Sequence, residues 1–472
     1  MISAIHSASK ASGALLAMLL LGGCATFSPD GGFGTVQSIA QERMGVTPKL
    51  VKNDEDAARV RDELKRILAE PLTAESAVRI GLLNNRGLRA SYAELGIAEA
   101  DLVQAGRLRN PVFSYQSAGG RGVSEYERQF FFDLLGLLTM PARTEIERRR
   151  FETAQLRVAG EVLKLAQTTR QTFFSAVAAQ EAAKYFEQAQ SAAQAGAELA
   201  ARMAEVGNFS RLRQQREQAF YAEVTAELAR ARQAAVRERE RLTRLLGLTG
   251  AQGFTLPERL PGLPAATMTE KDIAQRAMET RLDVRMARRE LEGLAKNLGL
   301  NKATRFVNVL EVSYLNNKAT GEERVQGYEI ELSLPIFDWG GARTAKAEAL
   351  YTQAMNRVAE IAVNAESEVR EVYHAYRTAH DLARHYRDEI VPLRKRISDE
   401  NLLRYNGMLI GVWELLADAR QQVTSVNAAI QTLKDFWLAE SNLQMSLNGI
   451  GAGAMPMNAA GANVAADAGG GH

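Results

Sequence analysis

The sequence has a single cysteine, few prolines, almost no net charge and no long hydrophobic run beyond its N-terminal residues. One cysteine in 472 residues excludes a disulfide framework or a cysteine-based zinc site within one chain. With 58 basic and 56 acidic residues, the net charge of +2 excludes a nucleic-acid binder that depends on phosphate contacts. Nothing after Cys24 approaches 18 uninterrupted apolar residues, so any crossing of a bilayer must use strands.

The residues that are abundant indicate a folded and largely helical protein. Apolar residues make up 46% of the chain and charged residues 24%, which excludes wholesale disorder. Only 11 prolines interrupt long alanine-rich stretches, and this composition favours long helices over a series of small sandwiches. The length allows several ordinary domains or one elongated architecture.

The N-terminus has the features of a targeting signal. Lys10 precedes an apolar run, 11–21, that suits the core of a signal peptide but is too short to span a bilayer comfortably. The residues Leu21-Gly22-Gly23-Cys24 resemble a bacterial lipobox, in which the cysteine becomes the lipidated first residue of the mature protein. We therefore expect 1–23 to be a lipoprotein signal peptide and Cys24 to carry the lipid. The alternative is an ordinary signal peptide with an incidental cysteine.

The residues after the cysteine indicate a destination. Ala25 and Thr26 follow it without the aspartate that often retains lipoproteins in the inner membrane, so the implied destination is the outer membrane. Lipidation also explains why one thiol needs no partner in an oxidising periplasm.

Both ends of the mature chain are weakly patterned. Residues 24–71 are expected to form an N-terminal linker, Gly-rich over 25–48, followed by a short charged helix over 54–70. Residues 450–472 are rich in Ala, Gly, Asn and Met without periodicity, and we expect them to be a disordered tail.

Between these ends the chain repeats itself. Gly207 is matched 200 residues later by Gly407, and two further pairs of segments match at offsets of 200 and 196. An indel in a loop would produce the small difference between the two offsets. These pairs are Ala142-Arg143-Thr144 with Ala342-Arg343-Thr344, and Leu88-Arg89-Ala90 with Val284-Arg285-Met286. The pattern predicts two equivalent repeats, 72–250 and 269–449, joined by a Pro-rich linker over 251–268.

Each repeat contains the same order of helices and strand candidates. The expected helices are 73–107, 142–206 and 210–246 in the first repeat, and 269–302, 342–405 and 412–447 in the second. At 1.5 Å per residue the two longest reach roughly 95–100 Å, far beyond a compact domain. The shorter helices of each repeat could together match one long partner end to end, which describes a tall cylinder of coiled coils.

Four segments between the helices alternate with a period of two. The strand candidates are 111–117, 125–134, 306–314 and 328–334. One face of each is apolar and aromatic, such as Tyr126, Phe130 and Phe132, whereas the other face is polar, such as Glu127 and Asp133. This pattern is typical of a membrane barrel, although a water-soluble sheet packed on one face would show it too. Four strands cannot close a barrel and lipid does not tolerate an open edge, so strands in a membrane require several chains to pool them.

At this point the resemblance to the TolC-type outer membrane efflux family is clear. It covers about Leu72 to Gly449 and rests on the lipobox, the duplicated helix–hairpin–long helix–helix unit, the two glycine turns and one motif after the last strand. That motif is Leu332-Ser333-Leu334-Pro335-Ile336-Phe337-Asp338-Trp339-Gly340-Gly341. The resemblance implies a mixed α/β membrane protein, in which a duplicated α-helical coiled-coil tunnel carries two β-hairpins per chain. In a homotrimer these hairpins form a shared twelve-stranded outer-membrane β-barrel, and the periplasmic tunnel docks an inner-membrane pump through an adaptor protein.

The resemblance also assigns roles to the two glycine turns. In this family the turns lie at the periplasmic tip of the tunnel, where the adaptor docks. The matching residues here are Val206, Gly207, Asn208, Phe209 and Ser210 in the first turn, and Asn406, Gly407, Met408 and Leu409 in the second. Glycine permits a tight reversal of the chain, and the flanking apolar side chains offer contacts to a partner. Alternatively, these side chains pack the turns internally.

The expected aperture of the tunnel departs from the family pattern. Family members commonly have acidic residues just after the second turn, whereas the two matching positions here hold Trp413 and Leu416. Glu414 and Asp418 lie nearby but are rotated around the helix by about 100° per residue. We therefore expect an apolar gate that closes by packing and dewetting rather than by a ring of carboxylates.

The sequence does not indicate an enzyme, a cofactor or a metal site. His374, His380 and His385 share one expected helix, but their spacing is not that of a zinc motif, and solvated or tunnel-lining histidines are the simpler interpretation. No nucleophile elbow or nucleotide-binding loop occurs in a suitable context, so transport energy must come from a partner. Two other functions stay open: the conduit of a type I protein secretion system, and a periplasmic coiled-coil adaptor lipoprotein. The sequence does not distinguish drugs, metal ions, solvents and proteins as cargo.

Overall fold

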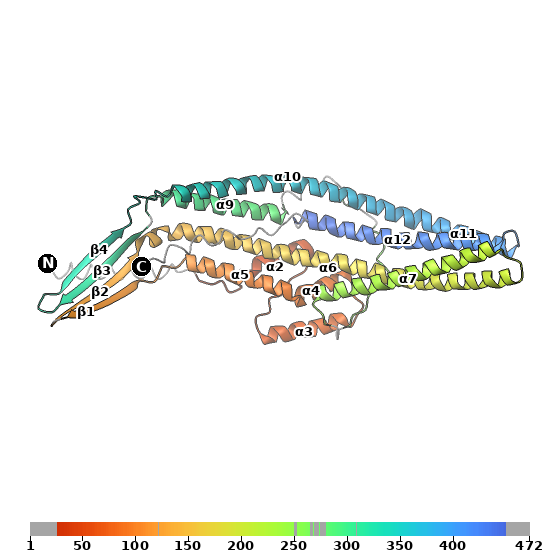
Figure 1. Ribbon diagram of the computed structural model, residues 1–472, viewed down its shortest axis with the longest axis horizontal. Helices are drawn as coiled ribbons and strands as arrows, with labels where there is room; N and C mark the ends of the chain where they lie inside the picture. Colours follow the sequence, from red (N-terminus) through yellow and green to blue (C-terminus); the bar gives the residue numbers. More distant parts are fainter. Residues whose placement is uncertain are drawn as a thin grey trace. The chain divides into compact units, whose positions relative to one another are not determined.

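The computed structural model describes residues 26–120, 122–249, 253–264, 268, 273, 280–307 and 309–449. The expected signal peptide, Cys24 and the expected tail 450–472 lie outside these ranges. The chain divides into two compact units, and the two long helices α6 (Leu134–Glu205) and α10 (Gly341–His385) contribute residues to both. Figure 1 labels the helices and strands of the chain.

The first unit contains the sheet and the helices that adjoin it. Its elements are α2 (Phe33–Met44), β1 (Val112–Gly120), β2 (Val123–Asp133), β3 (Leu310–Ala319), β4 (Val325–Leu332), most of α5 (Arg86–Ala105) and α9 (Leu282–Ala303), and the adjoining parts of α6 and α10. The four strands are antiparallel in the order β1-β2-β3-β4, so β2 and β3 join the hairpin of one repeat to that of the other. The expectation of two hairpins per chain is confirmed.

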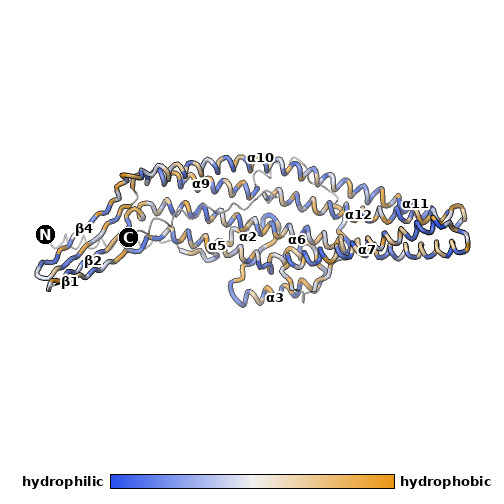
Figure 2. The backbone as a smooth tube through the Cα atoms, viewed as in Figure 1, coloured by the Kyte–Doolittle hydropathy of each residue, from blue (hydrophilic) through white to orange (hydrophobic). Residues whose placement is uncertain are grey.

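The register places like side chains beside one another across the whole sheet. Phe113, Phe130, Tyr314 and Tyr328 form one aromatic row, with ring centroids 4.8 Å apart in the first pair and 5.5 Å apart in the last. The alternation of hydrophobic and hydrophilic residues along the strands is visible in Figure 2. The predicted division into an aromatic face and a polar face is therefore confirmed, and cross-strand aromatic pairs stabilise the register.

The polar face of the sheet is rich in carboxylates. Its acidic residues are Glu125, Glu127, Asp133, Glu311, Glu329 and Glu331. Asp133, Glu311 and Glu331 are direct cross-strand neighbours, an arrangement in which like charges repel. Within the described strands, this face carries no lysine or arginine.

The strands extend further toward the hairpin turns than the sequence predicts. The strand expected at 306–314 is β3, which begins later, at Leu310, but continues to Ala319. The strand expected at 328–334 is β4, which begins earlier, at Val325, and ends at Leu332. Residues near the turns are small or polar and lack alternation, so the pattern detected only the apolar part of each strand. The predicted strand 125–134 includes Leu134, but this residue begins α6.

The expectation of a linker over 25–48 is partly wrong, because the segment contains helix α2. Buried Phe33 and Val36 pack this short helix onto the unit, and the ring of Phe33 meets that of Tyr92 of α5 edge-on at 4.8 Å. Tertiary packing therefore orders a segment that has weak helical periodicity on its own.

The second unit is a bundle of helices. Its elements are α3 (Asp54–Leu68), α4 (Ala74–Asn84), α7 (Arg211–Leu246), the π-helical turn η1 (Tyr386–Ile390), α11 (Val391–Asn406) and α12 (Val412–Leu447), together with the adjoining parts of α6 and α10. The expected bounds of the helices at 210–246 and 412–447 agree with α7 and α12 within one residue.

Two expected helices are interrupted. The helix expected at 73–107 begins as predicted with a capping box between Thr73 and Ser76, but it breaks at Asn85, whose backbone is extended. The helix expected at 342–405 contains η1, which directly precedes Pro392 in the first turn of α11. Proline lacks the N–H that continues an α-helix, and a π-helical turn accommodates the missing hydrogen bond without ending the helix.

Side chains from other segments of the unit cap the C-termini of α7 and α12. The amide of Asn84 donates to the carbonyls of Leu246 and Gly247, at 3.1 and 2.7 Å, and thus satisfies the last carbonyls of α7. The buried guanidinium of Arg281 donates to the carbonyl of Ser446 at the end of α12, at 2.9 Å, and pairs with Asp283 and Glu368. The helices α7 and α12 therefore each end in a specific side-chain cap.

Candidate functional site

The turn between α6 and α7 contains the first glycine singled out in the sequence. Gly207 has φ of 79°, its N–H donates to the carbonyl of Ala204 at 3.1 Å, and the N–H of Asn208 donates to that of Met203 at 2.9 Å. This is a Schellman cap with glycine in the left-handed position. The hydroxyl of Ser210 then accepts from the N–H of Arg213 and begins α7.

The turn between α11 and α12 has the same hydrogen bonds but a different residue in the left-handed position. The N–H of Met408 donates to the carbonyl of Tyr405 at 2.9 Å, and the N–H of Leu409 donates to that of Arg404 at 2.8 Å. Met408 has φ of 58°, whereas Gly407 has an ordinary φ of −78°. Met408, not Gly407, is therefore the structural counterpart of Gly207, and the expectation that Gly407 permits the reversal is wrong.

The apolar side chains of the two turns divide into exposed and buried ones. Val206 is 70% exposed, Met408 93% and Leu409 77%, whereas Phe209 is only 8% exposed. Phe209 packs with Ala200 and Val412 in a small cluster at the end of the bundle. Internal packing thus accounts for Phe209, and Val206, Met408 and Leu409 are left as a surface, here named the tip surface.

The different backbones of the two glycines lead to a prediction. Gly207→Ala should destabilise the protein by about 1–2 kcal/mol, because an L side chain is strained at positive φ. Gly407→Ala should stabilise it by about 0.4–1 kcal/mol, because the native φ suits alanine and the unfolded chain loses freedom. Thermal unfolding of the two purified variants checks this, and equal destabilisation by both would contradict it.

The residues expected at the aperture lie in the first turns of α12. Trp413 and Leu416 pack at the edge of the cluster that contains Phe209, and Leu416 lies against Gly196 of α6. Glu414 is exposed, and Asp418 is half-buried with no hydrogen-bond partner for its Oδ2 among the described residues. The structure thus places the two apolar residues against their own chain's helices and leaves Glu414 at the surface.

An ion pair that the sequence did not indicate joins α12 to α7 beside these residues. The guanidinium of Arg420 bonds the carboxylate of Glu217, which is 2% exposed. The same guanidinium lies over the rings of Phe220 and Trp413, at 5.0 and 5.1 Å from their centroids. Burial raises the pKa of Glu217, and the positive charge of Arg420 opposes this rise.

A sequence signal for Glu217 exists in retrospect. Glu217 stands at helical spacing from Tyr221, Val224 and Leu228, which pack into the bundle. A charged residue within the apolar stripe of a helix indicates an oppositely charged partner in the interior.

The three histidines singled out in the sequence do not form a site. His380 contacts Asp381 and the ring of Phe436, whereas His385 pairs with Glu389 at 3.2 Å. In the described part of the chain, no three acidic, His or Cys side chains are grouped so that they could hold a metal ion. None of the helices within the described ranges combines the length and the apolar character needed to cross a membrane.

Comparison with known proteins gives a distant relative in sequence. The cobalt-zinc-cadmium resistance protein CzcC of Cupriavidus metallidurans is 25% identical over 276 residues. The matched region covers 58% of this chain and 65% of CzcC, just under two thirds of that relative. No protein-family model matches the chain.

Comparison with solved structures gives the fold. The outer-membrane channel OprN has a TM-score of 0.68 at 19% identity and covers 82% of this chain and 92% of its own. The outer membrane protein VceC of Vibrio cholerae has a TM-score of 0.66 at 15% identity, and the match covers 80% of this chain and 96% of VceC. The CmeC outer membrane channel of Campylobacter jejuni has a TM-score of 0.65 at 14% identity, and the match covers 88% of this chain and 92% of CmeC. These neighbours are described as channels and outer membrane proteins, not as enzymes. The chain therefore has the fold of the TolC-type outer membrane efflux channels, as the resemblance in its sequence predicts.

Proposed function

We propose that this protein is the outer-membrane exit duct of a tripartite efflux system, through which substrates from an inner-membrane pump and periplasmic adaptor pass to the outside. The observation that carries the proposal is the four-stranded sheet, with one aromatic face in register across all four strands and one acidic face. An aromatic outer face suits lipid and a polar inner face suits water, as in membrane barrels. The fold shared with outer membrane channels supports the same function.

The edges of the sheet indicate the oligomeric state. Within the described strands, β1 and β4 each pair on one side only. Lipid does not tolerate unpaired strand edges, and four strands are too few to close around a lumen. We propose a homotrimer in which β4 of one chain pairs with β1 of the next, closing a twelve-stranded barrel.

Cys24 is proposed as the lipidated N-terminus of the mature chain. The structure begins beyond it, but the N–H of Ser28 donates to Glu99 of α5 at 2.6 Å. Four residues span at most about 14 Å, so the cysteine is tethered within that distance of Ser28. Glu99 lies about 9 Å from the end of α5, which leads into β1. An acyl chain on Cys24 would thus be able to reach the membrane beside the barrel.

The tip surface is proposed as the docking site of the adaptor. Val206, Met408 and Leu409 are exposed, whereas most apolar side chains of the second unit pack within the bundle. The two repeats, 72–250 and 269–449, would each contribute one turn to this tip.

The aperture is proposed at Trp413 and Leu416, closing by apolar packing. We expect Glu414→Gln to leave the block of channel current by divalent cations unchanged, because the constriction is proposed to consist of the apolar side chains of Trp413 and Leu416 and not of a ring of carboxylates. Single-channel recordings in planar bilayers check this. A strong divalent block that disappears in Glu414→Gln would instead indicate an acidic gate, with Asp418 as the next candidate.

Metal ions are the first cargo to test. The relative CzcC is named for resistance to cobalt, zinc and cadmium, and the acidic face of the sheet would attract cations into the lumen. A type I protein secretion conduit would have the same fold, and a periplasmic adaptor would not need the barrel strands.

A deletion strain tests the proposed function. The strain should become sensitive to compounds in a panel of metal salts, dyes, detergents and antibiotics, and wild-type protein should restore resistance. Complementation with Cys24→Ser shows whether lipidation is needed. A heat-resistant trimer in the outer-membrane fraction separates a channel from an adaptor. Unchanged resistance together with loss of a secreted protein would favour the secretion conduit and contradict efflux.

A further inference from the structure

The segment between β4 and α10 exposes an unusual concentration of large apolar side chains. Its exposed members are Leu334, Ile336, Phe337 and Trp339, and Phe337 is 99% exposed. Hydrophobic residues also mark this turn from strand to helix in Figure 2. Isolated exposed apolar residues are ordinary, but a contiguous group indicates contact with a partner or a membrane.

This segment is held in place rather than loose. The carbonyl of Trp339 accepts from Nε of Arg305 at 3.0 Å, and the Trp339 ring meets the ring of Phe306 edge-on at 6.3 Å. Gly340 has φ of 68°, and a Cβ there would lie 2.7 Å from the carbonyl oxygen of Arg305. The backbone therefore fixes the position of the exposed side chains.

The first repeat exposes apolar residues at the same point. Leu137 and Leu138, in the first turns of α6, are exposed just after β2. Both strand-to-helix transitions of the first unit thus carry a hydrophobic surface, although one is helical and the other is an irregular loop containing Pro335. Two different local structures with the same surface character indicate a common environment.

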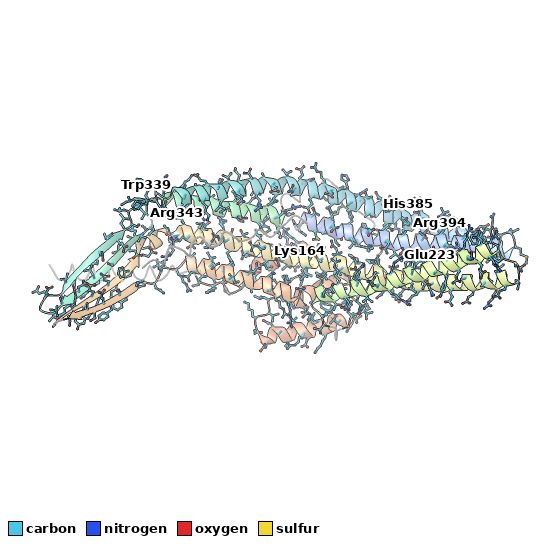
Figure 3. The ribbon with its side chains drawn as sticks, in the orientation of Figure 1. Lys164, Glu223, Trp339, Arg343, His385 and Arg394 are labelled. Carbon is cyan, nitrogen blue, oxygen red and sulfur yellow. The ribbon has the colours of Figure 1, made fainter. Side chains whose placement is uncertain are left out.

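Two features favour lipid as that environment. The segment continues directly from Ile330 and Leu332, which lie on the aromatic face of the sheet. Arg305 and Arg343 stand beside the segment; the Arg305 guanidinium is 5.3 Å from the Phe306 ring, and Trp339 and Arg343 lie at the same end of α10 (Figure 3). Apolar and Trp side chains next to cationic groups match the boundary between acyl chains and phosphate headgroups. The carboxylate within the segment, that of Asp338, accepts a hydrogen bond from the N–H of Gly340 at 2.8 Å.

We propose that the segment Leu334–Trp339 is an interfacial membrane anchor, which inserts into the headgroup boundary of the periplasmic leaflet with Arg305 and Arg343 beside lipid phosphates. This inference rests on the proposed function, because it takes the sheet to be in the membrane. The anchor fixes the depth of the barrel at the edge where the strands become helices.

The chain contains three tryptophans, which allows a depth measurement by fluorescence. The double variant Trp413→Phe/Trp437→Phe retains Trp339 as the sole probe. The matched control, Trp339→Phe/Trp413→Phe, retains Trp437, which stacks on Phe174 at 4.9 Å within the helical unit. An insertion control places Ile330→Trp in a background with all three native tryptophans changed to Phe. Each protein is reconstituted as the full chain into vesicles containing phosphatidylglycerol and brominated phosphatidylcholine.

We expect Trp339 to lose most of its emission in vesicles with bromine near the headgroups and less with bromine deep in the acyl chains. Ile330→Trp should be quenched more by the deep bromine, and Trp437 by neither. Quenching of Ile330→Trp without quenching of Trp339 would mean that protein, such as a second copy of the chain, covers the segment, and the anchor would be overturned while the barrel stands. No quenching of either probe would overturn the proposed barrel itself.

Discussion

Replacing Glu217 by alanine is expected to destabilise the protein by about 3 kcal/mol, because it leaves the Arg420 guanidinium half-buried and unpaired. Arg420 lies over two aromatic rings and has no second carboxylate among its described ion pairs. The carboxylate of Glu217 therefore compensates most of the cost of removing this charge from water. Thermal unfolding of the purified, detergent-solubilised protein measures the loss.

Substitution of the partner, Arg420, tests whether the unpaired charge causes the loss of stability. Arg420→Met should destabilise by a similar amount, whereas Glu217→Leu combined with Arg420→Met should recover most of the loss, because an apolar pair needs no compensation. Recovery identifies the unpaired charge as the cause. If the double variant is as unstable as the sum of the single ones, the ion pair is not the source.

The pH dependence of Arg420→Met provides an independent check. Without the guanidinium only burial acts on Glu217, so its folded-state pKa lies above the unfolded value. A raised folded-state pKa gives stability that is present at low pH and lost as the pH rises through it. The loss of folding stability of Arg420→Met relative to wild type should therefore be largest at neutral pH and become smaller as the pH is lowered. A deficit that does not change with pH would contradict the assignment.

Replacing Met408 by glycine is expected to separate stability from function. Glycine adopts the left-handed backbone of this position without strain, so the variant should be more stable by about 1 kcal/mol. The same change removes a side chain that is 93% exposed at the proposed docking surface. If Met408 is an anchor for the adaptor, its loss costs roughly 2 kcal/mol of binding, about thirtyfold in Kd.

Binding of the purified channel to its adaptor and efflux in cells are the two measurements for this variant. Met408→Leu is the matched control, because it keeps an apolar side chain and should bind as the wild type does. Leu409→Asp should weaken binding without destabilising the helices, since Leu409 is exposed. Full binding and efflux by Met408→Gly and Leu409→Asp would remove the tip surface from the docking site.

The sequence predicted the elements whose pattern is periodic over many residues. The alternation that places Phe130 and Tyr314 on one face anticipated the sheet, because a strand exposed to two environments must alternate. The ends of α7 and α12 were also predictable, because glycine and N-cap residues stand at them. In these places local preference and tertiary structure favour the same conformation.

The sequence failed where long-range contacts decide. Helix α2 is ordered through contacts such as that between Phe33 and Tyr92, which are far apart in the chain. The partner of Glu217 is 203 residues away, and no periodicity indicates which arginine it meets. At the second turn the sequence predicts glycine as the left-handed residue, but the hydrogen bonds place that conformation one residue later, at Met408. The type of residue alone does not determine at which position of a helix C-terminus the backbone becomes left-handed.

The two unpaired edges of the sheet have a consequence for biogenesis. If three chains must combine before β1 and β4 find partners, the barrel cannot form within one chain, and its formation follows the law of mass action. The population of closed barrels would then fall with roughly the third power of subunit concentration when expression is low. Until closure, each subunit carries two strand edges open to mispairing. Shielding by periplasmic chaperones, and rapid degradation of orphan subunits, should therefore accompany the synthesis of this protein.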